Sequence, residues 1–234
     1  MTSSPRQPSR RRIPVIGLVG GIGSGKSEVA RVLESLGCVV LDSDAQAKAM
    51  LDRDDVRREL VSWWGPDILS KPAGSDPGAA RAIDRAAVAR IIFSDPAQRT
   101  RLERLIHPLL HQQRRARIES LELAAPAPPA IVIDAPLLIE AGVDRECDVL
   151  VFVDAPRAQR VRRVRETRGW DEAELARREA AQMPLDTKRA RCQHHVRNDG
   201  SLESLRAQVA GMLTRMRADL AANSVARGPD SELN

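Results

Sequence analysis

Residues 13–36 read IPVIGLVGGIGSGKSEVARVLESL, and this stretch decides the fold class. The apolar run Val15–Val19 is short enough to be a buried strand, and apolar residues at helical spacing follow from Val29 to Leu36. Between them, Gly20–Ser27 fits the motif G-x-x-x-x-G-K-[ST]. Strand, glycine-rich loop and helix in this order predict a phosphate-binding P-loop.

The residue types of this loop suit a nucleoside triphosphate. Glycines let successive backbone N–H groups turn toward phosphate oxygens, and the helix that follows adds the positive end of its dipole. Lys26 can reach the β- and γ-phosphates, and the Ser27 hydroxyl can bind Mg²⁺. A dinucleotide-binding G-x-G-x-x-G motif is excluded, because counting from Gly21 and Gly23 puts Lys26 at the last glycine.

Composition excludes several other classes. The net charge is +5, but four arginines lie within residues 1–12, and without them it falls to about +1. With no tyrosine and few aromatic residues, we expect no nucleic-acid partner. Three distant cysteines favour a reducing, cytoplasmic setting, and we expect no signal peptide and no membrane span. A monomer or weak homo-oligomer is the expected state.

Along the chain, apolar strand runs alternate with helical patterns. We expect further strands at Cys38–Leu41, Ala130–Asp134, Asp148–Asp154 and around Val196, and a final helix at Leu202–Leu220. The predicted fold is α/β, a P-loop NTPase-type doubly wound parallel sheet of five strands. Its nucleotide-binding core comprises residues 13–44, 130–156 and 184–222.

Other segments surround this core. We expect disordered tails at 1–12 and 223–234 and a helical insertion with its linker at 45–129, broken at Gly65-Pro66 and by a loop at 71–78. Residues 157–183 form a charged helical pair, hinged near Gly169, that can act as a lid. Arginines that close from a lid can stabilise a transferring phosphoryl group, and Arg163 and Arg168 are candidates. A charged, solvated helix face is the alternative for them.

Aspartates follow two of the predicted strands, at the sheet edge where ligands bind. Of Asp42 and Asp44, one could accept the proton of an attacking hydroxyl and the other could hold Mg²⁺ through water. The alternative is a cap of the helix from Ala45; function is favoured for Asp44, because a cap needs only one of the pair. For Asp134, a functional role and a helix cap are equally good interpretations.

Two other patterns point away from metal binding. His107 and His111 stand four apart on a predicted helix, but they lack the glutamate of H-E-x-x-H and a third ligand, which favours a structural role. Cys192 precedes two histidines, but the other cysteines offer no partner pair for zinc. Guanine-specific GTPases usually carry N-K-x-D, and no asparagine here is followed by lysine.

From residue 13 to about residue 220, the chain resembles the dephospho-coenzyme A kinase family. The resemblance rests on VGGIGSGKS (Val19–Ser27), LGCVVLDSDA (Leu36–Ala45), IIFSDP (Ile91–Pro96), LIHPLL (Leu105–Leu110), DAPLLIE (Asp134–Glu140), R-x-x-x-Q-M-P (Arg178–Pro184) and NDGS (Asn198–Ser201). It implies transfer of the ATP γ-phosphoryl group to the ribose 3′-hydroxyl of dephospho-coenzyme A, with the helical insertion binding this small-molecule substrate.

The resemblance also implies roles for residues. Asp44 becomes the base, with Lys26 and Arg163 as further catalytic candidates, and Ser27 and Asp42 are the candidates for Mg²⁺. The expected ATP-binding residues are Gly21, Ile22, Gly23, Ser24, Gly25, Lys26, Ser27 and Glu28.

Two departures from the family stand out. Glu28 replaces a usual hydroxyl residue, and Thr167-Arg168-Gly169 replaces R-D-G, so Arg163 fits the lid pattern better than Arg168. Another P-loop metabolite kinase, acting on a nucleoside, nucleotide or sugar, and a nucleotide-binding switch protein are the alternatives.

Overall fold

The computed structural model describes residues 13–70 and 81–225. The predicted tail at 1–12, the predicted loop at 71–78 and residues 226–234 of the second tail lie outside the described residues. The chain divides into two compact units, one from the described parts of Met1–Asp42 and Ser120–Asn234 and the other from those of Ser43–Glu119. This helical unit therefore ends at Glu119, ahead of the predicted boundary at residue 129.

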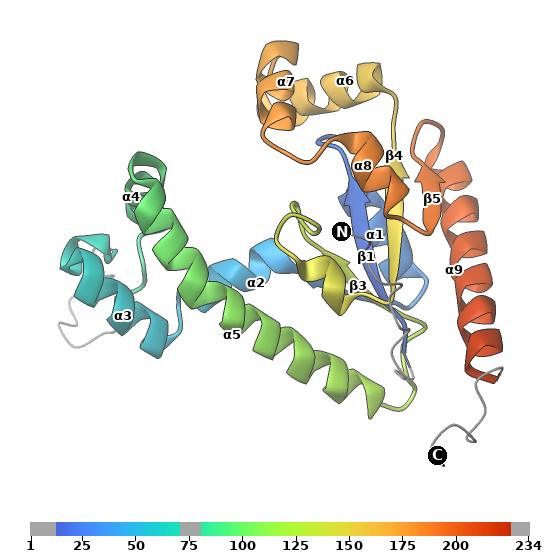
Figure 1. Ribbon diagram of the computed structural model, residues 1–234, viewed down its shortest axis with the longest axis horizontal. Coiled ribbons are helices and arrows are strands. Elements are labelled where there is room, and N and C mark those ends of the chain that lie inside the picture. Colours follow the sequence, from blue (N-terminus) through green and yellow to red (C-terminus); the bar gives the residue numbers. More distant parts are fainter. Residues whose placement is uncertain (1–12, 71–80, 226–234) are drawn as a thin grey trace, which may run out of the picture. The chain divides into compact units, whose positions relative to one another are not determined.

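A five-stranded parallel sheet is the centre of the first unit (Figure 1). Its strands are β1 (Val15–Gly20), β2 (Val39–Asp42), β3 (Ile131–Asp134), β4 (Val149–Asp154) and β5 (His194–Arg197). They lie in the order β2-β3-β1-β4-β5, with every pair parallel. This confirms the predicted doubly wound α/β fold. Because all strands run the same way, their carboxyl ends meet at one edge of the sheet.

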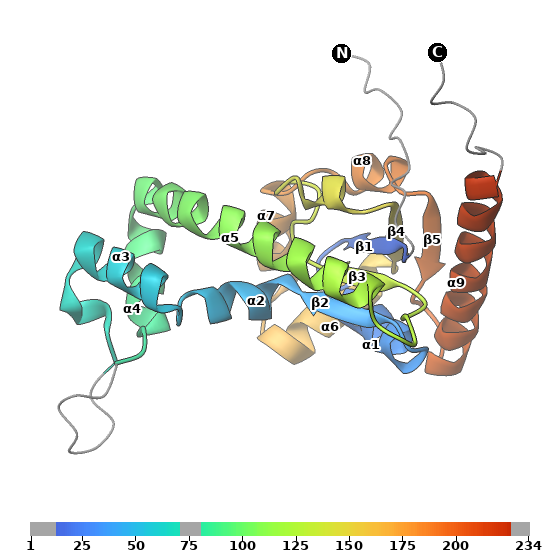
Figure 2. The same ribbon diagram turned by 90° about the horizontal axis from the view of Figure 1, so that it is seen from below.

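Helices α1 (Lys26–Ser35) and α9 (Leu202–Val225) cover one face of the sheet. Their apolar side chains pack with Ile16 and Leu18 of β1 in one core. On the other face lie the short helix α8 (Leu185–Ala190), which packs against β1, and the β3–β4 connection with η2 (Val143–Glu146) (Figures 1 and 2). Gly17 allows the β3–β4 connection to pack this closely, since a Cβ there would lie 2.8 Å from Cys147 Sγ and 3.1 Å from Leu138 Cδ1.

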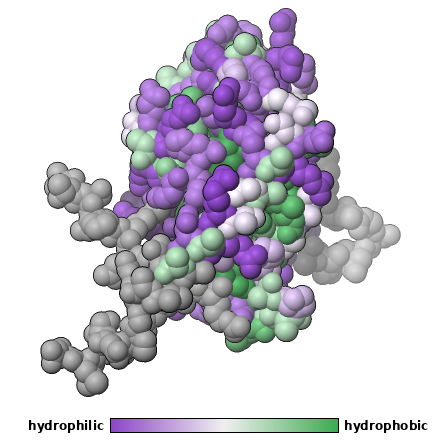
Figure 3. All heavy atoms as spheres, turned by 90° about the vertical axis from the view of Figure 1, so that its right-hand side faces the viewer, coloured by the Kyte–Doolittle hydropathy of each residue, from purple (hydrophilic) through white to green (hydrophobic). Residues whose placement is uncertain are grey.

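Helix α9 continues to Val225, into the segment predicted as a tail. Its apolar residues Leu205, Val209, Met212 and Met216 are buried against the sheet. Seen from the side of α9, the surface is mainly hydrophilic, with small separate hydrophobic patches (Figure 3). No helix in residues 13–70 and 81–225 is long and apolar enough to cross a membrane.

Two further helices carry the arginines of the predicted lid. They are α6 (Arg157–Arg168) and α7 (Glu172–Ala180). Gly169 ends α6 with a φ of 67°, and Asp171 caps α7 by accepting a hydrogen bond from the Glu174 backbone. The predicted break near Gly169 is therefore found where this glycine adopts the left-handed conformation.

The second unit is mainly helical. It contains α2 (Ser43–Met50), α3 (Asp54–Trp64), η1 (Pro66–Ile68), α4 (Arg85–Ser94) and most of α5 (Pro96–Glu122). These helices have their own apolar core, which includes Val56, Leu60 and Ile68. Helix α3 ends at Trp64 and Gly65 is its C-cap, at the predicted break, and one antiparallel bridge joins Leu69 to Ile83.

Candidate active site

The P-loop connects β1 to α1 at the carboxyl edge of the sheet. Gly25 precedes α1 with a φ of 91°, in the left-handed region that glycine adopts without strain. The loop is hydrogen-bonded to itself: Ser24 N donates to Gly21 O at 3.2 Å, and Glu28 N donates to Gly25 O at 3.0 Å. A turn of this kind exposes backbone N–H groups at the start of the helix, where an anion can bind.

Glycine is needed at position 25 for a second reason. A Cβ built on Gly25 would lie 2.0 Å from Asn198 Nδ2, so any larger residue would displace the Asn198 side chain. The buried hydroxyl of Ser24 has no hydrogen-bond partner within the described residues. The loop is thus tightly enclosed by its neighbours and retains an unused polar group.

Lys26 is the central cation of this site. Its ammonium group donates to the carbonyl of Gly20 at 3.3 Å. Burial lowers the pKa of Lys26; the carboxylate of Asp134 opposes this shift, whereas the charges of Lys188 and Arg168 add to it. A partly desolvated ammonium group beside oriented N–H groups suits the binding of a polyphosphate.

The carboxylates predicted to work with Lys26 end neighbouring strands. Asp42 of β2 is the register partner of Asp134 of β3, and Asp134 in turn pairs with Leu18 of β1. Strand β2 ends at Asp42 and α2 begins at Ser43, so Asp44 lies in the first turn of a helix, where the strand does not continue. Asp42 and Asp44 therefore do not point the same way through strand alternation. Because the helix starts before Ala45, Asp44 is not its N-cap residue.

Arg163 of α6 contacts the P-loop through the backbone carbonyl groups of the loop. Its guanidinium group donates to Ser24 O at 3.1 Å and Gly23 O at 3.4 Å, and also to Asn198 O at 2.9 Å. The side chain of Asn198, which is 7% exposed, donates to the same Ser24 carbonyl at 3.0 Å. In this arrangement Arg163 binds loop carbonyl groups; its predicted direct role toward a phosphate stays a prediction.

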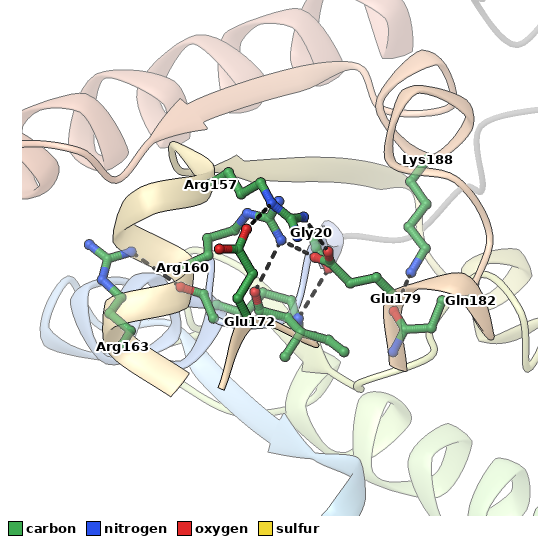
Figure 4. Close-up of polar contacts among 11 residues, drawn as sticks. Gly20, Arg157, Arg160, Arg163, Glu172, Glu179, Gln182 and Lys188 are labelled. Atoms are coloured by element: carbon green, nitrogen blue, oxygen red, sulfur yellow. Dashed lines mark hydrogen bonds and ion pairs between the residues drawn. The ribbon is translucent and has the colours of Figure 1, made fainter. Parts of the chain in front are cut away.

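Other arginines of α6 are held by carboxylates (Figure 4). Glu179 of α7 pairs with both Arg157 and Arg160 of α6, and Arg157 also binds Glu172 at 3.0 Å. Arg160 is 6% exposed and donates to Ile22 O of the P-loop at 3.4 Å. The ion pairs therefore tie α7 to α6 while α6 contacts the loop. Arg168, the other candidate, lies over the Trp170 ring at 4.8 Å.

An ion pair between a buried lysine and a partly exposed glutamate joins α8 to the loop after β3. Lys188 is 2% exposed and pairs with Glu140 at 2.8 Å. Its ammonium group also donates to the side-chain oxygen of Gln182 at 3.0 Å (Figure 4). Glu140 also accepts from Met183 N at 3.2 Å. Burial would raise the pKa of Glu140, but the hydrogen bond and charge of Lys188 hold it below its ordinary value. This pair holds the segment between α7 and α8 beside the loop that follows Asp134.

Glu28, the unusual residue of the loop, turns along α1. Its carboxylate pairs with Arg31 at 3.2 Å, one helical turn away.

His107 and His111 are exposed on α5. Among the described residues, no group of three or more His, Cys, Asp or Glu side chains could hold a metal ion. The hydroxyl of Ser27 and the carboxylates of Asp42 and Asp134 are oxygen donors of the kind that Mg²⁺ prefers. Mg²⁺ is usually bound by only one or two protein carboxylates together with substrate phosphates.

Several residues with contacts at the site had no assigned role in the sequence analysis. Asn198, Glu140 and Gln182 belong to motifs that carry the family resemblance, so a signal was present. Arg160 and Lys188 gave none, because a charged residue in a charged helix is ordinarily solvated. Their burial follows from how α6 and α8 pack on β1 and the P-loop, which the one-dimensional pattern does not show.

Together, the parallel sheet, the P-loop, the half-buried Lys26 and the edge carboxylates define a P-loop phosphotransferase of the kinase type. The family model described as dephospho-CoA kinase matches residues 14–204. The chain is 36% identical to the dephospho-CoA kinase of Synechococcus sp. over 91% of this chain and 100% of that relative. It is 40% identical to the Geobacter sulfurreducens enzyme over 83% of this chain and 94% of that relative.

Solved structures of similar proteins agree with these sequence comparisons. TT1252 from Thermus thermophilus matches with a TM-score of 0.68 at 36% identity and covers 88% of this chain and 99% of its own. The dephospho-CoA kinase from Campylobacter jejuni matches with a TM-score of 0.65 at 18% identity, over 88% and 98% of the two chains, and supports the fold. The chain belongs to the dephospho-CoA kinase family, phosphotransferases that act on an alcohol group. Family membership implies ATP as the phosphate donor and a small-molecule acceptor.

Proposed function

We propose that the chain transfers the γ-phosphoryl group of ATP to the ribose 3′-hydroxyl of dephospho-coenzyme A. The observation that carries the proposal is the complete P-loop around Lys26 in a chain of this family. Lys26 would bind the β- and γ-phosphates, and the N–H groups at the start of α1 would bind their oxygens. Because its charge is partly desolvated, Lys26 interacts strongly with charge that develops on the transferred group.

The acceptor side of the reaction rests on Asp44. This exposed carboxylate lies in the first turn of α2, two residues after the end of β2. It is not the N-cap residue of its helix, which leaves it available to receive the proton of the attacking hydroxyl. Residues of the helical unit would hold the acceptor.

Mg²⁺ completes the proposed donor site. Ser27, at the start of α1, and Asp42, at the end of β2, supply hard oxygen donors that fit this ion. Asp134 is a third oxygen donor at the same sheet edge. When bound, Mg²⁺ would supply positive charge that offsets the charge of the phosphate groups.

A product assay tests the proposal. The purified protein is incubated with Mg-ATP and dephospho-coenzyme A, and mass spectrometry is used to find a product with a 3′-phosphate. Nucleosides, nucleotides and sugars serve as alternative acceptors, and ATP hydrolysis without any acceptor is measured in parallel. Phosphorylation of another acceptor alone, or acceptor-independent hydrolysis alone from a folded protein, would contradict the proposal.

We further propose a cytoplasmic enzyme that works as a monomer or weak homo-oligomer without a nucleic-acid partner. Cys38, Cys147 and Cys192 form no disulfide with one another, and Cys38 and Cys147 are buried, as suits a reducing compartment. Light scattering of the purified protein tests the oligomeric state, and titration with labelled DNA and RNA tests the absence of nucleic-acid binding.

A further inference from the structure

The carbonyl group of Ser24 accepts hydrogen bonds from two side chains, one on α6 and one directly after β5. Asn198 Nδ2 donates to it at 3.0 Å, and the Arg163 guanidinium group donates to it at 3.1 Å. The two donors are themselves joined, since Arg163 also binds the main-chain oxygen of Asn198 at 2.9 Å. Neither contact is explained by helix, sheet or turn formation.

Hydrogen bonds hold the backbone around Asn198 in place. Its backbone N–H donates to Asp154 O at 2.7 Å, which ties it to the end of β4. Gln159 of α6 adds a link on the other side, because it donates to Asp199 O at 3.0 Å and accepts from Arg163 at 3.3 Å. The missing Cβ of Gly25 leaves the space that the Asn198 amide fills.

Peptide geometry gives this contact a consequence for ligand binding. In a planar trans peptide, the C=O of one residue and the N–H of the next point in opposite directions. A donor that holds the Ser24 carbonyl outward therefore holds the Gly25 N–H inward, at the N-terminus of α1. Arg160 acts in the same way on Ile22 O, which fixes the direction of the Gly23 N–H.

We propose that Asn198 is a positioning residue for the triphosphate. It acts through the Ser24–Gly25 peptide, which it shares with Arg163, and its amide does not bind the nucleoside. Preset N–H groups need no reorganisation when an anion binds, which is the physical gain from this contact. The inference rests on the proposed role of the P-loop as the site for the ATP phosphates.

Binding of inorganic tripolyphosphate in the presence of Mg²⁺ tests the inference directly, because this probe has no base or ribose. Isothermal titration compares the wild type with Asn198→Ala for tripolyphosphate, ATP and adenosine. Loss of one hydrogen bond should weaken tripolyphosphate and ATP by a similar factor of about three to ten. Adenosine binding and the KM for dephospho-coenzyme A should not change.

Gln208→Ala is the matched control. Gln208 also uses its amide to hold main chain, but at the neighbouring Arg197, where it bonds both N and O at 3.2 Å. This variant should bind all three probes like the wild type. A second test variant, Arg163→Gln, removes the other donor. In the double variant with Asn198→Ala, the loss should exceed the product of the single losses, because only then does the Ser24 carbonyl lack both donors.

The remaining outcomes overturn the inference in distinguishable ways. If Asn198→Ala weakens ATP and adenosine but not tripolyphosphate, Asn198 contacts the nucleoside. If this variant binds every probe like a wild type that does bind tripolyphosphate, the inference fails and the proposed function stands. If the folded wild type binds no tripolyphosphate, the donor half of the proposed function fails with it.

Discussion

Asp42 and Asp134 are register partners at the carboxyl ends of the neighbouring strands β2 and β3. The two carboxylates therefore share one sheet edge, but they differ in their effect on the P-loop lysine. The charge of Asp134 raises the pKa of Lys26 against the stronger effect of burial. Asp134 thus helps keep Lys26 protonated. We infer that Asp134 is the more important of the two for the donor site.

The variant Asp134→Asn should therefore shift the pH profile of the enzyme. Without this carboxylate, the ammonium form of Lys26 loses a favourable neighbour, so the pKa of Lys26 falls further below its ordinary value of 10.5. The alkaline limb of kcat/KM for ATP should move to lower pH. Steady-state kinetics on the alkaline side of neutrality measure this limb, and titration with Mg²⁺ should show a weaker metal response.

Asp42→Asn is the comparison for this prediction. It removes a carboxylate from the same edge, but Asp42 is not among the charges that shift the pKa of Lys26. We expect it to weaken the Mg²⁺ response with a smaller shift of the alkaline limb. Equal shifts in both variants, or none in Asp134→Asn, would contradict the specific coupling of Asp134 to Lys26.

A second prediction concerns the proposed base. Asp44→Asn should retain ATP affinity and lower kcat by about 10²-fold or more, because a neutral amide cannot take the proton of the attacking hydroxyl. Asp54→Asn is a matched control, since Asp54 also lies in the first turn of a helix. Both changes should have small, similar effects on stability. If Asp44→Asn turns over normally, Asp44 only supports its helix and the base is elsewhere.

The ion pair between the buried Lys188 and the partly exposed Glu140 gives a stability prediction. Glu140→Gln leaves the buried Lys188 ammonium without its carboxylate and should lower the free energy of unfolding by about 3 kcal/mol. Lys188→Met should cost less, because water can reach the Glu140 carboxylate that it leaves unpaired. The double variant should lose less than the sum of the two, with a coupling of about 1–3 kcal/mol. Urea denaturation of all four proteins closes the cycle, and additive losses would show that the pair contributes no coupling.

Much of the fold followed from local sequence patterns. Five apolar runs predicted the five strands, and the motif of Gly20–Ser27 predicted the P-loop, since both signals lie within a few consecutive residues. The end of β2 did not follow, because the sequence Asp42-Ser43-Asp44 is compatible with an extended strand, a turn or a helix start. The structure starts α2 at Ser43, so the two aspartates belong to different elements.

The contacts around the P-loop were harder to predict. Ser24, Arg163 and Asn198 are far apart in sequence, and only the parallel β4–β5 pairing brings the last of them to the loop. Arginine is abundant in α6, so the pattern predicted charge at the site without showing which guanidinium group reaches it. The interpretation of Arg163 as a phosphate clamp came from its type and spacing, whereas its observed acceptors are backbone carbonyl groups.

Glu28 offers a last prediction, because it stands where the family usually has a hydroxyl residue. Its backbone N–H is bonded to Gly25 O, as any residue there would allow, and its carboxylate pairs with Arg31. Glu28→Thr should therefore change the KM for ATP by less than about twofold, as expected for a partly exposed charge that is already paired. Arg31→Ala should have the larger effect, since it leaves the Glu28 charge uncompensated one turn from the phosphate site. That increase in the KM for ATP should shrink at high salt and disappear in the double variant with Glu28→Thr. An increase that persists in the double variant would mean that Arg31 acts on ATP directly and that the carboxylate of Glu28 is irrelevant to it.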